Sequence, residues 1–246
     1  MSIETPEDLE GMRQAGKVTR AVLEAMKAAA VAGISTAELD EVGAEVMCRC
    51  GAVSGPKKVY DFPGYSCISV NDEVVHGVPG NRKLGDGDLV KLDVTVEIGG
   101  FMGDACETVA VGNVLPERRK LIDCAQEAFR AGLAVVRPGI RAYEIGKAVQ
   151  QTVRHAGFHV VRDLGGHGIG RTIHEAPFIP NDFDPRCSDL LTEGLVFTIE
   201  PIIAMGTSRT FTRKDGWTIR TRDRSFAAHY EHTLVVTKDG AQLLTA

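Results

Sequence analysis

Hydrophobic and polar residues alternate along residues 90–98, a period of two that is typical of a β-strand with one apolar face. Gly99-Gly100 follows, and two glycines supply the positive φ angles that a two-residue hairpin loop needs. Residue 98 should therefore pair with residue 101. Asp104 then lies opposite Thr95, on the face that carries Asp93, so the two aspartates are diagonal neighbours about 7–8 Å apart at the backbone.

A period of three to four residues predicts helices on either side of this hairpin. Thr5-Pro6-Glu7-Asp8 is typical of a helix start, and apolar residues then recur with this period up to about Ala30. Ser35-Thr36-Ala37-Glu38 forms a capping box that opens a second helix, which ends at about Cys50. Residues 51–64 are expected to be a loop because they contain several glycines and prolines.

The helix pair recurs after the hairpin. Its turns and caps match in both copies: EAMKA at 24–28 corresponds to EAFRA at 127–131, Gly33-Ile34 to Gly139-Ile140, Glu38-Leu39 to Glu144-Ile145, and Gly51 to Gly157. Chance repetition of helical composition is the alternative, but matched turns and helix lengths favour a duplication. We expect one catalytic domain, residues 1–246, with pseudosymmetric halves of about 1–115 and 116–246. The halves should share one curved sheet with helices on its outer face, which leaves the other face for a site.

Composition and charge exclude several classes of protein. The net charge of -5 gives no general attraction for nucleic acid or for an anionic membrane. No apolar run approaches about 18 residues, and the acidic N-terminus is unlike a signal peptide. Six cysteines without CxxC spacing predict reduced thiols. We therefore expect a cytoplasmic protein without a membrane segment.

The neighbouring aspartates of the hairpin repel each other unless something compensates their charge. Lys91 could pair with one of them, or both could be exposed to water. A divalent metal ion, or two ions about 3.5–4 Å apart, would instead use both as ligands.

Three stretches of the second half carry further candidate ligands. His167 lies in a glycine-rich stretch, residues 165–170, that lacks the GxGxxG spacing of a phosphate-binding loop. Alternation along residues 195–201 places Glu200 opposite the core residues, and Glu231 precedes an apolar run.

Each candidate also has a purely structural interpretation. His167 could bind a backbone carbonyl, Glu200 could end an exposed strand, and Glu231 could pair with Arg222 or Arg224. Taken together, four carboxylates and one imidazole in one cleft require compensation, because burying like charges costs several kcal/mol each. An oxygen-rich set with one histidine suits Mn, Fe, Co or Zn.

The motifs around these residues resemble those of bacterial type I methionine aminopeptidases, from the first helix to Val236. The matching motifs are HGVP at His76, GRTIHEAP at His174, FTIEP at Glu200, KDGW at Trp217 and YEHT at Glu231, together with Asp93, Asp104 and His167. The resemblance implies the pita-bread fold, an α/β (α+β) arrangement of duplicated halves around a curved, mainly antiparallel sheet. It also implies a hydrolase that removes the initiator methionine from new proteins when the next residue is small.

The resemblance further implies two divalent metal ions and the roles of individual residues. Asp93, Asp104 and Glu231 would hold one ion, and Asp104, His167, Glu200 and Glu231 the other. Glu200 would carry the proton from the nucleophile to the leaving amine. His76 and His174 would contact the scissile amide and stabilise the oxyanion.

The methionine pocket departs from the family pattern. Phe62 and Cys67 match the family's wall residues, and Trp217 matches its tryptophan at the rim. The family often has a tyrosine, a cysteine and a phenylalanine where this chain has Val59, Pro56 and Ile173. The shape of the pocket is therefore expected to differ.

The expected partners are the deformylated N-termini of nascent polypeptides, near the ribosome, acted on by a monomer without specific nucleic-acid binding. We expect no cysteine-rich zinc extension ahead of the catalytic domain. One alternative is a proline-specific aminopeptidase of the same fold, whose members usually carry an extra N-terminal domain. The other is a non-catalytic binding scaffold that kept the fold.

Overall fold

The computed structural model describes residues 1–246, and its first two helices begin where the sequence predicts, each with a capping box. In α1 (Pro6–Ala29), the Thr5 side chain accepts a hydrogen bond from the backbone N–H of Asp8, whose carboxylate accepts from the N–H of Thr5. In α2 (Thr36–Arg49), Ser35 and Glu38 make the same reciprocal pair. These bonds satisfy backbone donors that the first turn of a helix cannot pair internally.

The central hairpin has the predicted register. Strands β4 (Leu89–Ile98) and β5 (Phe101–Ala110) pair Ile98 with Phe101 and Thr95 with Asp104. Gly99 and Gly100 take φ angles of 60° and 83°, as the two-residue loop requires. The prediction that Asp93 and Asp104 share one face of the sheet is confirmed.

The second helix pair repeats the first. Helices α4 (Pro116–Val135) and α5 (Ala142–His155) follow the hairpin, and α5 is 14 residues long, the same length as α2. The glycines that precede and follow the shorter helices, Gly33, Gly51, Gly139 and Gly157, all have positive φ. The predicted match of the turns is therefore seen, but the predicted match of the caps is wrong, because α4 and α5 begin after Leu115 and Arg141 without a side-chain cap.

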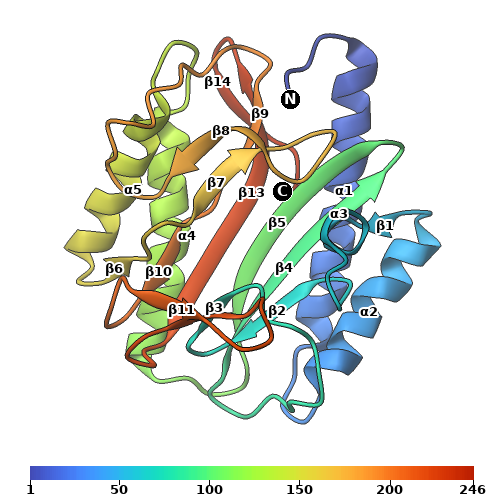
Figure 1. Cartoon of the computed structure of the whole chain (residues 1–246), viewed down its shortest axis with the longest axis vertical. Helices are drawn as coiled ribbons and strands as arrows, with labels where there is room; N and C mark the ends of the chain where they lie inside the picture. Colours follow the sequence, from blue (N-terminus) through green and yellow to red (C-terminus); the bar gives the residue numbers. More distant parts are fainter.

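One antiparallel sheet of eleven strands joins the two halves, with the four long helices on one side of it (Figure 1). Its main path runs β1-β4-β5-β13-β9-β7-β8. The strands on this path beyond the hairpin are β1 (Val53–Ser54), β13 (Ala227–Thr237), β9 (Val196–Ile199), β7 (Gly165–Gly168) and β8 (Glu175–Pro180). The remaining members of the sheet are β2 (Cys67–Val70), β6 (His159–Val160), β10 (Ile202–Ala204) and β14 (Gly240–Leu243). Strand β13 pairs with β5 of the first half and β9 of the second.

A separate sheet of three strands also connects the halves. It contains β3 (Glu73–Val75) from the first half, and β11 (Thr210–Thr212) and β12 (Ile219–Thr221) from the second. Two hydrophobic clusters of 23 and 18 buried residues fill the space between the large sheet and the two helix pairs. None of the helices has the length and apolar character that a membrane span requires.

The prediction that residues 51–64 form a loop is wrong in part. This segment contains β1 and the short helix α3 (Gly55–Tyr60). The Ser54 side chain caps α3 by accepting from the N–H of Lys57, and Pro56 occupies its first turn. The proline counted as a loop signal is therefore a helix-start signal, because its fixed φ suits the first turn.

Candidate metal centre and substrate cleft

All ten side chains predicted for the site line one cavity of about 310 Å³ between the halves. They are His76, Phe62, Cys67, Asp93, Asp104, His167, His174, Glu200, Trp217 and Glu231. Leu92 and Val94 of β4 pack in the core cluster that includes residues of α1 and α2, so the alternating Asp93 points to the other face. The cavity therefore occupies the face of the sheet that the helices leave open.

The five proposed metal ligands come from five different strands or strand ends. Asp93 lies on β4, Asp104 on β5, His167 on β7 and Glu231 on β13, while Glu200 directly follows β9. Ligand atoms of Asp104, His167 and Glu231 lie within 4.8 Å of one another. The curved sheet thus brings side chains up to 138 positions apart into one cluster.

Two oxygen atoms of this cluster, Asp104 Oδ1 and Glu231 Oε1, are buried without any hydrogen-bond partner. An unpartnered buried polar atom costs about 1–3 kcal/mol, and more when it is charged. A divalent cation would satisfy both atoms, and oxygen ligands with an imidazole are a donor set that divalent metals accept. The residues present therefore fit a metal ion.

The raised pKa values of the carboxylates also indicate that a cation belongs in this cluster. Burial raises the pKa of Asp104 to about 6. Burial and the neighbouring carboxylates also raise the pKa values of Asp93, Glu200 and Glu231 well above their usual range. Without a cation the cluster resists carrying its full negative charge.

No lysine or arginine compensates this charge. The Lys91 ammonium donates to the backbone carbonyl oxygens of Asn71 and Ala227, at 2.8 and 3.2 Å, rather than to an aspartate. The two arginines considered for Glu231 are also engaged elsewhere, since Arg224 pairs with Asp72 and Arg222 donates to the carbonyl of Thr210. The interpretations based on these counter-ions are wrong.

A hydrogen bond to a backbone carbonyl holds His167 in the tautomer that a metal ligand needs. Its Nδ1 donates to the carbonyl oxygen of Gly168 at 3.1 Å, and burial lowers its pKa to about 4. The neutral ring therefore keeps a lone pair on Nε2. Glycine at position 166 lets β7 lie close to β9, because any larger residue would place its Cβ 2.1 Å from the carbonyl oxygen of Thr198 on β9.

The two histidines predicted to contact substrate line the same cavity as the predicted metal ligands. The His174 ring lies 4.2 Å from that of His167 between centroids, and the two rings are tilted by 58°. Burial and the neighbouring His174 lower the pKa of His76 to about 4, and partial burial and His167 lower that of His174. Both imidazoles are therefore neutral at neutral pH, with one N–H each.

The wall of the pocket contains a tyrosine that the sequence did not predict. Tyr60 lines the cavity, and its hydroxyl lies 2.6 Å from His174 Nδ1. Val59 instead packs against a hydrophobic cluster that contains Met12 and Met102. The tyrosine is therefore supplied by the residue after Val59, at the last position of α3.

The other pocket residues form an apolar slot. Phe62 and Trp217 meet edge to face with ring centroids 5.2 Å apart, and Cys67 is buried beside them in the same cavity. Pro56 and Ile173, two of the departures from the family pattern, also line the cavity.

His229 is the second residue of the site that was not predicted. It lines the cavity two positions before Glu231 on β13, and its Nε2 lies 3.3 Å from Glu200 Oε2 and 3.4 Å from Glu231 Oε2. Alternation counted back from Glu231 places residue 229 on the same face, and this signal was present in the sequence.

Comparisons with known proteins agree with the resemblance seen in the motifs. The model of metallopeptidase family M24 matches residues 10–238. Methionine aminopeptidase 2 of Bacillus subtilis (strain 168) is 43% identical over 247 residues, covering 100% of this chain and 99% of that protein. Methionine aminopeptidase of Escherichia coli (strain K12) is 42% identical over 247 residues, covering 100% and 94%. The crystal structure of methionine aminopeptidase from Rickettsia prowazekii superposes with a TM-score of 0.96 at 37% identity and covers 100% of both chains.

Proposed function

This chain belongs to metallopeptidase family M24, and we propose that it is a metal-dependent aminopeptidase that removes the N-terminal methionine of proteins when the next residue is small. The observation that carries the proposal is the cluster of four carboxylates and one imidazole that lines one cavity and leaves two buried oxygen atoms without a partner. The full-length likeness to methionine aminopeptidases favours this activity over the proline-specific and non-catalytic alternatives.

The proposed centre holds two divalent ions, drawn from Mn, Fe, Co or Zn. Asp93, Asp104 and Glu231 would hold one, and Asp104, His167, Glu200 and Glu231 the other. The proximity of ligand atoms of Asp104, His167 and Glu231 supports a shared site. When bound, such a pair of ions lowers the pKa of a water molecule and polarises a peptide carbonyl.

Glu200 is proposed as the residue that moves the proton. Glu200 is 9% exposed and lines the cavity beside the other carboxylates of the cluster. It would take the proton of the attacking water and give it to the leaving amine nitrogen.

His76 and His174 are proposed to donate hydrogen bonds to the scissile amide and to the oxyanion that forms from its carbonyl. The Tyr60 hydroxyl would donate to Nδ1 of His174, at the observed 2.6 Å. A neutral imidazole then carries its proton on Nε2, which is the nitrogen left to contact substrate.

The substrate methionine would occupy the apolar slot lined by Phe62, Cys67 and Trp217, with Pro56 and Ile173 shaping its wall. An unbranched thioether adapts to an irregular pocket of this kind. Because the α-amine must be free, the substrates would be deformylated nascent chains. Action by a cytoplasmic monomer near the ribosome, in one catalytic domain with halves of about 1–115 and 116–246, stays a prediction.

The test compares two peptides after the metal has been removed and restored. The protein is treated with a chelator, dialysed, and supplied with Mn, Fe, Co or Zn before it is given Met-Ala-Ser or an Ala-Pro peptide. We expect methionine release to disappear with the chelator and to return with metal. Release of the residue before proline alone would indicate the proline-specific enzyme, and no cleavage of either peptide would indicate the scaffold.

A further inference from the structure

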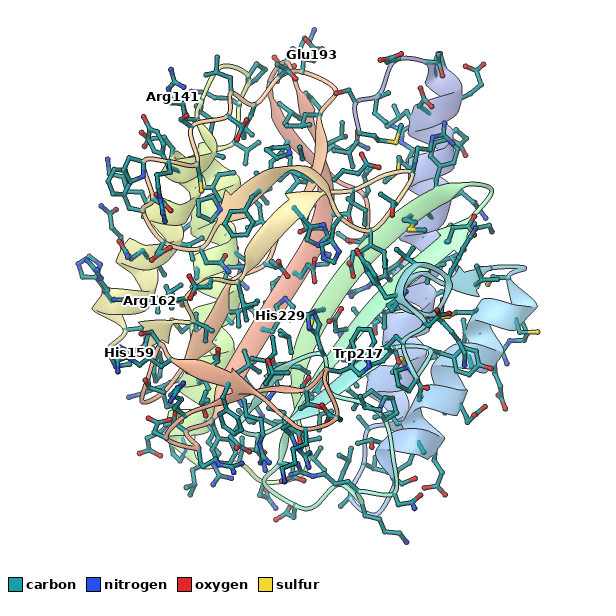
Figure 2. All side chains as sticks on the ribbon, in the orientation of Figure 1. Arg141, His159, Arg162, Glu193, Trp217 and His229 are labelled. Atoms are coloured by element: carbon teal, nitrogen blue, oxygen red, sulfur yellow. The ribbon has the colours of Figure 1, made fainter.

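His229 has no part in the reaction described above, although it lies at the floor of the same cleft. It is 1% exposed, and neither of its ring nitrogens has a hydrogen-bond partner. Figure 2 shows His229 near the middle of the sheet, on the same open face as Trp217. Since a buried polar group without a partner is costly, the position indicates that something else binds the imidazole.

The neighbours of His229 arrange ligand atoms around a common point. Its Nε2 lies 3.3 Å from Glu200 Oε2 and 3.4 Å from Glu231 Oε2, and ligand atoms of the three residues all lie within 4.8 Å of one another. Adjacent ligands at about 2.0–2.2 Å from a metal ion are about 2.8–3.1 Å apart in octahedral geometry and about 3.3–3.6 Å apart in tetrahedral geometry. The observed separations are those of ligands that share one cation.

A hydrogen bond does not account for this contact. Nε2 donates to neither carboxylate, despite the short distances to Glu200 and Glu231. A neutral imidazole with a free lone pair is the form in which histidine binds metals.

We propose that His229 is a further ligand of the metal centre and that, with Glu200 and Glu231, it binds one of the cations. The proposal rests on the metal centre assigned under the proposed function. With His167, the centre then has two imidazole donors. Because imidazole favours Fe, Co or Zn whereas carboxylate favours Mn, His229 should shift the preference of the site away from Mn.

Proton NMR of the Co²⁺-loaded full-length protein tests this directly, because each imidazole bound to Co²⁺ gives a strongly shifted, solvent-exchangeable N–H signal. We expect two such signals in the wild type and one in His229→Gln. His229→Gln should also weaken Co²⁺ binding by about 10- to 100-fold in a chelator competition, with a smaller loss for Mn²⁺.

His232→Gln is the matched control. His232 lies on the same strand, but its ring nitrogens contact the hydroxyls of Thr245 and Tyr230 at 2.9 and 3.1 Å, outside the cavity. This variant should keep both shifted signals.

A wild-type spectrum with one shifted signal overturns the proposal even if His229→Gln does not fold, as does an unchanged spectrum in a folded His229→Gln. Failure to bind Co²⁺ at all would instead overturn the metal centre and with it the proposed function. The NMR count does not depend on peptide hydrolysis, so the two failures are distinguishable.

Discussion

The carboxylate cluster predicts that the metal-free protein loses stability as the pH rises. The pKa of Asp104 is 3.8 in the unfolded chain and about 6 in the folded protein, because the folded protein buries the carboxyl. Between these values the folded state binds more protons than the unfolded state, so the free energy of unfolding falls as the pH increases. At about 1.36 kcal/mol per pH unit, the loss from Asp104 alone is about 3 kcal/mol above pH 6.

Asp104→Asn isolates this contribution, because the amide has nearly the same shape and carries no charge. In a chelator we expect the variant to be more stable than the wild type by up to about 3 kcal/mol near pH 8, and equal to it near pH 4. Added Mn²⁺ should reverse the order, since the wild type binds the ion more tightly. Asp93, Glu200 and Glu231, whose pKa values are also raised, should extend the wild-type loss to higher pH.

Urea unfolding followed by circular dichroism measures these free energies at each pH. Asp123→Asn, on the exposed side of α4, is the control and should follow the wild type at every pH. A metal-free Asp104→Asn protein that is less stable than the wild type near pH 8 would refute the reasoning, because the buried charge would then stabilise the fold.

Three further substitutions test the site and its supporting backbone. Glu200→Gln should keep the fold while kcat on Met-Ala-Ser falls by orders of magnitude, and a near-normal kcat would remove Glu200 from the mechanism. Tyr60→Phe should lower kcat about 10- to 100-fold with little change in KM, because His174 loses the hydrogen bond that fixes its tautomer. An unchanged kcat would contradict this. Gly166→Ala should lower the free energy of unfolding by about 1–3 kcal/mol, because the new Cβ would lie 2.1 Å from the Thr198 carbonyl oxygen. Gly80→Ala, where a Cβ meets nothing within 4 Å, should leave the melting temperature unchanged.

The parts of the site that local pattern determines were predictable from the sequence. A two-residue glycine loop fixes the register of a hairpin, and alternation then fixes which face each residue takes. Asp93 and Asp104 could therefore be placed together from the amino-acid pattern alone, and the register of β4 and β5 confirms it. The comparisons with known proteins confirm the family resemblance and the pita-bread fold.

The parts that were missed depend on contacts between distant segments. Tyr60 contacts a histidine 114 positions away, and no local period indicates that contact. Lys91 is near the aspartates in sequence, but its ammonium extends to carbonyls of Asn71 and Ala227. His229 was accessible to the alternation argument, but a histidine outside the recognised motifs carried no separate signal.

The most direct test is a crystal structure of the Mn²⁺-loaded protein with anomalous data collected at the manganese edge. We predict two anomalous peaks about 3.5–4 Å apart, both bridged by Asp104 and Glu231. Ordered Mn²⁺ bound elsewhere, with the carboxylates of Asp104 and Glu231 contacting no ion, would contradict the central claim that these strands meet to hold a metal pair.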